Sequence, residues 1–464
     1  MAKYKAYPEY KDSGVEWLGE IPAHWKISKL RYQCSFAKGL TITKEHLQDD
    51  GIPCVNYGEV HSKYGFEVDP QKHSLKCVSD KYLKDNSSAL LIKGDVVFAD
   101  TSEDIEGSGN FTQLVSDTIT FAGYHTIIAR PFKRENSRFY AYLLDCKELR
   151  TQVRHAVKGV KVFSITQAIL RSLSVWLPTE NEQERIAAFL DHETTKIDTL
   201  IEKQQQLIEL LKEKRQAVIS HAVTKGLNPD VPMKDSGVEW LGEVPAHWTV
   251  RRLKHTASLQ SGIPKGKDLT GKNSISVPML RVANVQDGYL DLEEIHNIDI
   301  EPNQLERYLL CDGDVLMNEG GDNDQLGRGT VWAAQIENCI HQNHVFAIRP
   351  KNIESEWLDM LTRAAYAKFH FYRVAKQSTN LASISSTNIK ETPLLIPPTE
   401  ERNKIIKFIK YQLKKLKSTE ELSITQIALL QERRTALVSA AVTGKIDVRD
   451  WVAPDIQKTE ETAA

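Results

Sequence analysis

The sequence predicts a mixed α/β protein made of two copies of one module, each a mixed domain followed by a long helix. Residues 11–25 read KDSGVEWLGEIPAHW and residues 234–248 read KDSGVEWLGEVPAHW, so only one residue in fifteen differs. Apolar residues recur in alternating steps of three and four from Leu190 onward and again from Ile409 onward. Such stripes are typical of coiled-coil helices. We expect the two helices to pair antiparallel between two domains that are related by a pseudo-two-fold axis.

The repeat extends well beyond that segment, at an offset of roughly 220 residues. The matching stretches are Leu91–Val96 with Leu310–Val315, Tyr124–Pro131 with Asn343–Pro350, and Glu213–Thr224 with Glu432–Thr443. A period this long indicates a duplicated module rather than a solenoid. A duplicated chain suits a partner that itself has two related halves.

Each domain boundary is predicted from a change in pattern. Short β-type runs separated by turn residues fill each mixed region, and a strand that ends in proline closes it before the helical period begins. Single helices are predicted at 137–157 and at 355–376. We assign a first mixed domain to 1–178, a first long helix to 179–227, a second mixed domain to 228–397, a second long helix to 398–447 and a flexible tail to 448–464.

Polar residues interrupt the two apolar stripes at matching places. Gln204 matches Ser423, and Arg215 matches Arg434. Polar seam residues can fix the register of a helix pair, so we expect these positions to face the partner helix. The alternative is that the two long helices are separate oligomerisation elements.

Composition excludes several classes of protein. The 464-residue chain is 41% hydrophobic and 26% charged with a net charge of −2, which is ordinary for a globular protein. Its six cysteines form no C-x-x-C pair, so we expect a reducing cytoplasm rather than a secreted disulfide framework. No apolar run approaches the roughly 20 residues that cross a bilayer, so we expect no membrane partner.

Basic residues are nevertheless concentrated in parts of the chain. They gather in 251–272 and at equivalent places of the two copies, 144–171 and 360–390. A local basic surplus is what a phosphate-contacting surface needs. The alternative is that these residues form ordinary solvated helix faces.

The sequence holds no familiar catalytic pattern. No segment has the spacing of a phosphate-binding loop. The acidic runs 100–106 and 322–324 fit no calcium loop, and we interpret them as loop carboxylates, some of which accept hydrogen bonds from cytosine amino groups. The alternative for these runs is a two-metal nuclease site. His125 and His344 lie on apolar strands, so we expect both side chains in the core.

Five segments carry a family resemblance. They are GVEWLGEIPAHW at 14–25, GVEWLGEVPAHW at 237–248, GDVVFADTSED at 94–104, GDVLMNEGGDNDQLGRG at 313–329 and the helix start PTENEQERI at 178–186. Together they resemble the specificity (S) subunit of type I restriction-modification systems, over nearly the whole chain. One departure is in the second copy, where Asn403 stands at the position that usually holds Gln.

The resemblance implies a function. Each mixed domain would be a target-recognition domain that reads one half of a bipartite, asymmetric site in double-stranded DNA. The helices would space these domains and dock two methyltransferase (M) subunits, and restriction (R) subunits would complete the endonuclease. The chain itself would be non-catalytic, with no metal or cofactor of its own, because S-adenosylmethionine, ATP and Mg would belong to its partners. Alternatives are a stand-alone coiled-coil DNA-binding protein without a methyltransferase partner, a scaffold without a DNA role, and an enzyme active as the isolated chain.

Candidate DNA-contacting residues are basic, amide, hydroxyl and aromatic side chains in predicted loops and turns. Asn56 aligns with Arg281 through Pro53 and Pro278, so the two copies would place different readers at one site. The alternative for each candidate is a solvated surface side chain. The candidates are Lys38, Thr41, Asn56, Tyr57, Lys63, Tyr64, Lys158 and Lys161 in the first copy, and Lys265, Lys267, Arg281, Asn284, Asn323, Gln325, Arg328, Gln377 and Asn380 in the second.

Overall fold

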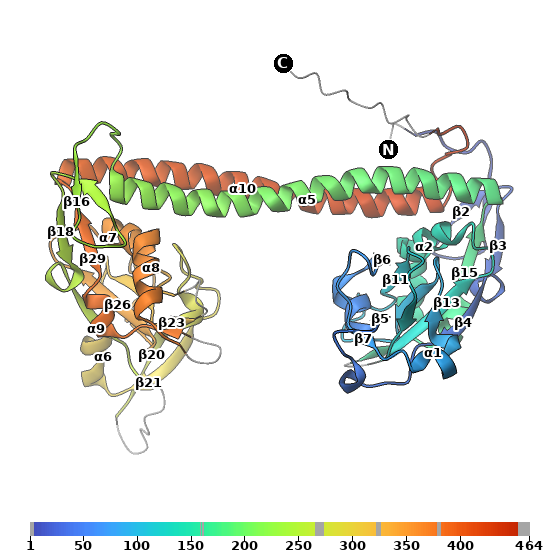
Figure 1. Ribbon diagram of the computed structural model, residues 1–464, viewed down its shortest axis with the longest axis horizontal. Helices are drawn as coiled ribbons and strands as arrows, with labels where there is room; N and C mark the ends of the chain where they lie inside the picture. The colour runs from blue at the N-terminus through green and yellow to red at the C-terminus, as the bar shows by residue number, and fades with distance from the viewer. Residues whose placement is uncertain are drawn as a thin grey trace. The chain divides into compact units, whose positions relative to one another are not determined.

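The chain folds into two compact units that share two long helices. The computed structural model describes residues 4–157, 159, 162–264, 273–321, 326–377 and 382–452. Unit 1 comprises Met1–Gln204 and Thr425–Ala464, and unit 2 comprises Gln205–Ile424. Each unit holds a mixed domain lying against one half of helix α5 (Glu180–Lys225) and one half of helix α10 (Thr399–Val442) (Figure 1). The predicted mixed fold with two copies and two long helices is thus confirmed.

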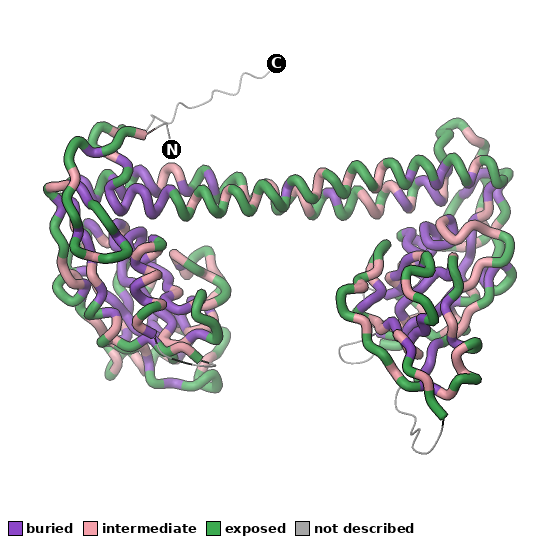
Figure 2. The backbone as a smooth tube through the Cα atoms, turned by 180° about the vertical axis from the view of Figure 1, so that it is seen from behind, coloured by how far each residue is buried: buried purple, intermediate pink, exposed green. Residues whose placement is uncertain are grey.

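The two long helices pack antiparallel within each unit. In unit 1, Ile186 and Leu190 near the start of α5 share a core with Leu437 near the end of α10. In unit 2, Ile219 near the end of α5 shares a core with Ile405 near the start of α10. Every position of the two predicted stripes is buried or half-buried, and Figure 2 shows buried and exposed residues alternating along both helices. Burial of these stripes stabilises the pairing.

Each seam arginine pairs with an acid, a pairing that the sequence had not predicted. Arg215 donates to the carboxylate of Glu420 at 2.8 Å inside unit 2. Arg434 donates to Asp198 at 3.0 Å and to Asp145 at 3.4 Å inside unit 1. Each arginine thus lies in the seam between the helices, and an acid neutralises its charge where the side chain is partly buried.

The domain of unit 1 is built on two sheets. The larger has five strands in the order β4-β13-β9-β11-β6, namely Cys34–Lys38, Thr126–Pro131, Val96–Ala99, Phe111–Leu114 and Phe66–Val68. The smaller has the order β7-β5-β12-β8, namely Cys77–Val78, Ile52–Val55, Thr120–Ala122 and Leu90–Leu91. Antiparallel strand pairs complete the unit: β1 (Tyr10–Asp12) with β2 (Glu20–Pro22), β3 (Lys26–Lys29) with β15 (Ser174–Leu177), and β10 (Thr101–Ser102) with β14 (Phe163–Ser164).

The domain of unit 2 repeats this plan. Its sheets have the orders β19-β26-β22-β24 (Ala257–Ser261, Val345–Pro350, Val315–Asn318, Gly329–Val331), β21-β20-β25 (His296–Ile300, Ile275–Leu280, Ile340–His341) and β23-β28-β27 (Gly320–Gly321, Ala382–Ser383, Lys376–Gln377). Two-stranded pairs are β16 (Met233–Asp235) with β17 (Glu243–Pro245) and β18 (Thr249–Arg252) with β29 (Pro393–Ile396). The shorter helices of the two domains are α1 (Tyr82–Asp85), α2 (Ser137–Asp145), α3 (Lys147–Ala156), α4 (Gln167–Ser172), α6 (Pro302–Tyr308), α7 (Ser355–Arg363), α8 (Ala365–Val374) and α9 (Ser386–Lys390).

The single helices predicted at 137–157 and 355–376 are each two helices, so that prediction was wrong. The breaks lie at Cys146 and Ala364, whose backbones are extended at ψ 150° in both cases. At each break a backbone N–H turns outward to a serine of a long helix, Lys147 to Ser439 at 3.0 Å and Ala365 to Ser220 at 2.8 Å. Neither break holds glycine or proline, and in both cases the serine of a long helix supplies the acceptor that the freed N–H needs.

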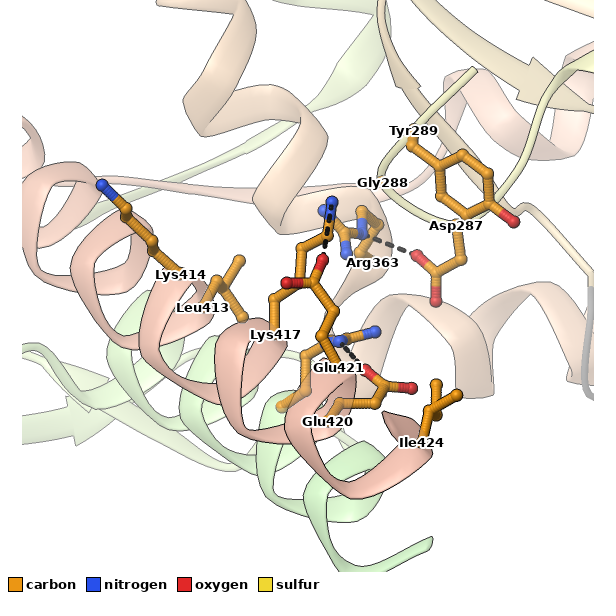
Figure 3. Close-up of a pocket in the computed structure, with 11 residues that line it drawn as sticks. Asp287, Gly288, Tyr289, Arg363, Leu413, Lys414, Lys417, Glu420, Glu421 and Ile424 are labelled. Atoms are coloured by element: carbon orange, nitrogen blue, oxygen red, sulfur yellow. Dashed lines mark hydrogen bonds and ion pairs between the residues drawn. The ribbon is translucent and has the colours of Figure 1, made fainter. Parts of the chain in front are cut away.

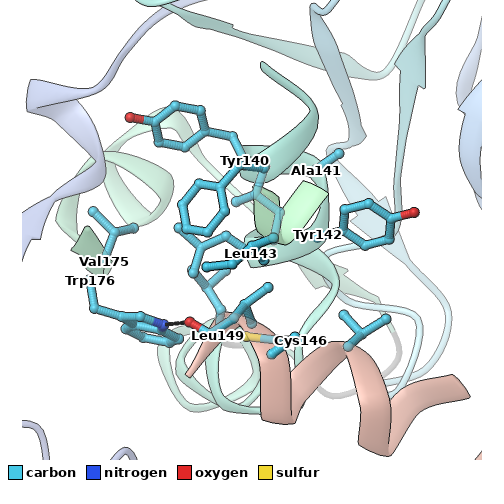
Figure 4. Packing of buried hydrophobic residues seen from close by; sticks show 14 of the residues in the cluster. Tyr140, Ala141, Tyr142, Leu143, Cys146, Leu149, Val175 and Trp176 are labelled. Carbon is cyan, nitrogen blue, oxygen red and sulfur yellow. Dashed lines mark hydrogen bonds between the residues drawn. The ribbon is translucent and has the colours of Figure 1, made fainter. Parts of the chain in front are cut away.

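The repeated fifteen-residue segment anchors each domain to its long helix. The ring of Trp25 in unit 1 is fully buried, and Trp248 in unit 2 is 1% exposed. The preceding histidine bonds a glutamate in the first turn of the helix: His24 lies 2.8 Å from Glu182, and His247 lies 2.7 Å from Glu401. The repeat therefore preserves a framework contact. Packing between the domain and the helix also involves Trp176, whose indole N–H donates to the carbonyl of Val442 at 2.5 Å beside the side chains of α2 (Figure 4).

The structure corrects the expected match at the start of the second helix. Gln183 donates its amide N–H to the carbonyl of Pro178 at 3.0 Å. The residue that makes the same contact in unit 2 is Arg402, which donates to the carbonyl of Pro397 at 3.1 Å. Arg402 rather than Asn403 therefore occupies the glutamine position, because Pro397, and not Pro398, is the residue that matches Pro178 at the shared offset of 219 residues.

The predicted tail is packed over the part that the structure describes. Val448 is 1% exposed within the unit 1 core, and the ring of Trp451 lies edge-on to Phe189 with centroids 5.6 Å apart. Residues 453–464 of the predicted tail lie outside the described residues. Across the described ranges, no helix combines the length and apolar character that a membrane span requires.

Candidate nucleic-acid interface

Three segments of unit 1 converge at one edge of its larger sheet. Strand β13 runs antiparallel to both of its neighbours, so Thr126 at its start lies beside Ala99 at the end of β9, and Ile127 lies beside Lys38 at the end of β4. The approach of the following loops is very close, because a Cβ on Gly39 would lie 2.0 Å from the carbonyl oxygen of Gly123. Only glycine allows this contact.

The loops at this edge enclose a cavity of about 640 Å³. It is lined by the predicted contact residues Lys38 and Thr41, both exposed, and by Asp100, His125 and Gln167. These side chains can donate to phosphate oxygens or to the acceptors and donors on base edges. The two predicted residues of the first loop are therefore gathered with His125 and Gln167, which had not been predicted as contact residues, and with Asp100 of the acidic run 100–106.

The predicted reader Asn56 braces the turn next to this cavity. Its side chain is buried, and its amide N–H donates to the carbonyl of Cys54 at 3.1 Å. Its backbone N–H donates to the carboxylate of Glu59 at 3.1 Å. A Cβ on Gly123 would lie 1.8 Å from Asn56 Oδ1, so Asn56 also fixes the neighbouring loop. In this structure Asn56 therefore positions the backbone that carries Tyr57.

Tyr57 follows Asn56 in that turn, where it is half-buried against a hydrophobic cluster and lies near the acidic loop. Its ring stacks on His61 with centroids 5.2 Å apart and an interplanar angle of 11°. Burial raises the pKa of the Tyr57 hydroxyl, and the carboxylates of Glu103, Asp104 and Asp100 raise it further, so the phenol remains a hydrogen-bond donor at neutral pH.

Lys63 and Tyr64 are not among the residues that line the cavity. Lys63 is exposed at the end of the π-helical turn Glu59–Lys63. The ring of Tyr64 stacks on His73 at 4.5 Å, and its hydroxyl donates to the carbonyl of Ser74 at 3.0 Å. Tyr64 thus has a packing role, whereas the ammonium group of Lys63 is open to solvent.

The strand register confirms the predicted match between Asn56 and Arg281. Val55 pairs with Ala122 in a parallel ladder, and Leu280 pairs with His341 in the equivalent ladder of unit 2. The next residues are Asn56 and Arg281. The turns differ in their bracing residue, because the Arg281 backbone N–H donates to Asn284 Oδ1 at 2.8 Å where Asn56 uses a glutamate.

The side chains of Arg281 and Asn284 have different surroundings. The guanidinium of Arg281 is 22% exposed and lies 3.9 Å from the carboxylate of Glu294. Asn284 is buried and donates to the carbonyls of Asp291 at 2.9 Å and Glu294 at 3.0 Å. Asn284 therefore holds the turn, and Arg281 is the residue there whose side chain can reach solvent.

Two further candidates in unit 2, Arg328 and Gln377, lie near the end of β22. Glu319, which follows β22, is the residue that matches Asp100 of unit 1. Asn318 donates its backbone N–H to the carbonyl of Arg328 at 3.0 Å, which places Arg328 beside the end of β22. Gln377 is exposed and pairs with Ala382, whose strand also pairs with Gly321. Glu319 lies between these contacts. The remaining candidates lie outside the described residues: Lys158, Lys161, Lys265, Lys267, Asn323, Gln325 and Asn380.

His125 and His344 are exposed, so their predicted place in the core was wrong. The side chain of His125 is 62% exposed and that of His344 is 55% exposed. Each precedes the first buried residue of its strand, at the open edge of the sheet. His125 Nδ1 lies 3.2 Å from Asp100, and His344 Nδ1 lies 2.7 Å from Glu319. The usable signal was the shared offset of 219 residues between the two acids and between the two histidines.

Part of the predicted basic surplus is neutralised within the fold. Arg252 and Lys254 both pair with Glu391. Arg363 is buried and donates to Asp287 at 2.6 Å beside a cavity of about 520 Å³ (Figure 3). It also donates to Asp359 at 3.2 Å. These contacts give such basic residues a structural role. The described residues contain no group of three or more histidine, cysteine or acidic side chains placed to hold a metal ion.

Comparison with known proteins decides the family. The model of the type I restriction modification DNA specificity domain matches residues 22–210 and again residues 245–426. The chain belongs to this family. The resemblance read from the five sequence segments is therefore confirmed, and the duplication corresponds to two specificity domains in one chain.

Curated relatives match this specificity subunit along most of its length. The EcoKI specificity subunit of Escherichia coli K12 is 22% identical over 460 residues, covering 96% of this chain and 94% of the relative. The StySPI specificity subunit of Salmonella potsdam is 22% identical over 457 residues with the same coverage, 96% and 94%. A chain solved in work on complex assembly and conformational transition of the type I restriction-modification system has a similar fold, with a TM-score of 0.66, 16% identity and coverage of 92% of this chain and 99% of that one.

Proposed function

We propose that this specificity subunit reads a bipartite, asymmetric site in double-stranded DNA, with one half-site for each domain. The observation that carries the proposal is a shared framework with different residues at matching positions of its exposed edge. β4 or β19 ends at an exposed Lys38 in one copy and an exposed Ser261 in the other. The turn after β5 or β20 holds the buried brace Asn56 in one copy, whereas in the other it holds Arg281, whose side chain reaches solvent. Different donor and acceptor sets read different base pairs.

The long helices are proposed to dock two methyltransferase subunits and to set the distance between half-sites. Support comes from large apolar side chains that stay exposed on the helices: Leu200 at 48%, Leu210 at 60%, Tyr411 at 67%, Leu422 at 64%, Ile424 at 55% and Leu429 at 59%. Exposed apolar groups of this size are typical of surfaces that another protein covers. Restriction subunits would join the same assembly.

Catalysis is assigned to the partners. In this proposal S-adenosylmethionine serves the methyltransferase subunits, and ATP and Mg serve the restriction subunits, while this chain supplies sequence recognition. Such a complex acts in the cytoplasm, where bacterial DNA lies.

The proposal is tested by expressing the full chain with the methyltransferase subunits in a host without other DNA methylation. The chain should co-purify with the methyltransferase, and sequencing of modified bases should return one motif with two different halves and a fixed spacer. Failure to co-purify would favour a stand-alone DNA-binding protein. Methylation or cleavage by the purified chain alone would show that it is an enzyme.

A further inference from the structure

A half-buried acid and an exposed histidine form the same arrangement in both domains. In unit 1, the backbone N–H of Asp100 donates to the carbonyl of His125 at 3.1 Å, and its carbonyl accepts from the N–H of Ile165 at 2.8 Å. The side chains then meet, with His125 Nδ1 3.2 Å from Asp100 Oδ1. The acid is thus fixed by the backbone on two sides and by an imidazole at its carboxylate.

Unit 2 reproduces each of these contacts with a longer acid. Glu319 donates its N–H to the carbonyl of His344 at 2.9 Å and accepts from the N–H of Ile384 at 2.9 Å. His344 Nδ1 lies 2.7 Å from Glu319 Oε2. The amide nitrogen of Asn343 lies 3.3 Å from His344 Nε2. An amide nitrogen only donates, so Nε2 accepts, and the neutral ring carries its proton on Nδ1, facing the carboxylate.

One carboxylate oxygen of each pair stays open. Within the described residues, Asp100 Oδ2 and Glu319 Oε1 accept no hydrogen bond, and the two carboxylate side chains are 31% and 28% exposed. When a ligand covers a fixed hydrogen-bond acceptor, the acceptor loses its water. This loss costs free energy unless the ligand supplies a donor. The open oxygen therefore suits a ligand that presents an N–H.

The neighbours of the pair in unit 1 supply contacts for the DNA backbone. Asp100 and His125 line the cavity that also holds Lys38, Thr41 and Gln167. Cationic and hydroxyl side chains of this kind bind phosphates, which lets a carboxylate enter a groove without net repulsion.

We propose that Asp100 and Glu319 are specificity-determining residues, each reading the amino group of a cytosine in its own half-site, and that His125 and His344 are the positioning residues that orient them. The proposal rests on the proposed function. A carboxylate accepts from cytosine N4, whereas guanine presents the acceptors O6 and N7 in the major groove and repels it. Adenine offers an amino group beside the acceptor N7, so a pure acceptor favours it less than cytosine.

The test uses the full chain assembled with its methyltransferase subunits and a library of randomised sites, with modified bases read by sequencing. Asp100→Ala should lower the preference at one G·C pair of one half-site by about 5- to 150-fold and leave the other half-site unchanged. Glu319→Ala should do the same in the other half-site. Asp100→Asn adds a donor at the same place, so that position should then accept adenine as well as cytosine.

A matched pair of variants isolates the histidine. His125 has φ +54°, which asparagine and glycine tolerate better than alanine. His125→Asn keeps a donor at the δ position and should retain most of the cytosine preference, whereas His125→Gly removes the donor and should lose it. Equal loss in both variants would contradict the positioning role.

The outcomes separate the two levels of the account. Absence of a two-part motif for the unmodified chain would overturn the proposed function. A two-part motif that Asp100→Ala and Glu319→Ala leave unchanged would overturn this inference and leave the proposed function standing. A change in both half-sites from one substitution would also overturn it. Should Asp100→Ala fail to fold, the isosteric Asp100→Asn decides, because it keeps the shape of the side chain.

Discussion

Ser439 of α10 accepts a hydrogen bond from the backbone N–H of Lys147 at 3.0 Å, at the break between α2 and α3. Ser220 of α5 accepts the equivalent bond from Ala365 at 2.8 Å. The serine caps a helix that belongs to the domain, and it does so from a long helix. Each long helix therefore shapes the domain that lies against it.

We predict that Ser439→Ala and Ser220→Ala each lower the free energy of unfolding by about 1 kcal/mol, because each leaves a helix-start N–H without its acceptor. Urea denaturation of the full chain measures the change. The control is Thr435→Ala, whose hydroxyl bonds only its own helix at Gln431. A loss for Ser439→Ala no larger than for this control would contradict the capping role.

The sequence predicted the periodic features of the fold and missed the tertiary ones. The apolar stripes from Leu190 and Ile409 follow a period that only paired helices satisfy, so they identified α5 and α10. The helix breaks at Cys146 and Ala364 depend on serines far along the chain. No local residue pattern encodes such a contact.

The candidate site was predicted in position more than in detail. Loops around Lys38 and Thr41 were found because turns and basic residues mark them. Asn56 was predicted to contact DNA because its amide can read a base edge. It lies instead at the buried end of a strand, where its side chain holds the turn in place. His125 was placed in the core from its apolar neighbours, although it lies at the open end of the sheet, where alternation no longer sets burial.

Asp359 should make the stability of unit 2 fall with rising pH. Burial raises the pKa of its carboxyl group to about 6, although Arg363 opposes the shift. The folded state keeps this proton where the unfolded chain, with a pKa near 3.9, has lost it. The stabilisation is fully present below about pH 4 and is lost as the pH rises through 6, by up to about 3 kcal/mol.

Urea denaturation between pH 4 and 7 checks this, with Asp359→Asn as the variant. The free energy of unfolding of the wild-type chain relative to the variant should decline across the interval. Asp312→Asn, at an exposed position, is the control. A constant difference between wild type and Asp359→Asn would show that the buried carboxyl group does not hold a proton.

Lys38 should contribute to affinity without contributing to sequence preference. If its ammonium group contacts a phosphate, Lys38→Ala weakens binding to all sequences alike and lowers the slope of log K against log salt by about one. Titrations of the assembled methyltransferase with DNA at several salt concentrations measure this. Lys26→Ala, an exposed lysine of β3, is the control. An altered motif with an unchanged salt slope would make Lys38 a base reader instead.

Lengthening both long helices should lengthen the target spacer. Insertion of four helical residues after Gln206 of α5 and four at the matching position of α10, after Thr425, adds about 6 Å and turns the following segment by roughly 40°. We expect a spacer longer by about two base pairs, at about 3.4 Å each, with both half-sites unchanged. A folded, methylating complex with its original spacer would exclude the helices as the ruler.

The central claim is that each domain independently reads one half-site. Its most direct measurement is the methylated motif of a chain in which residues 26–177, from the start of β3 to the end of β15, are replaced by residues 249–396, from β18 to β29. The two repeated fifteen-residue segments, 11–25 and 234–248, and both long helices remain. We predict an inverted repeat of the original second half-site, because two identical domains then face the DNA from a duplicated framework. A methylating complex that keeps the original asymmetric motif would contradict the claim.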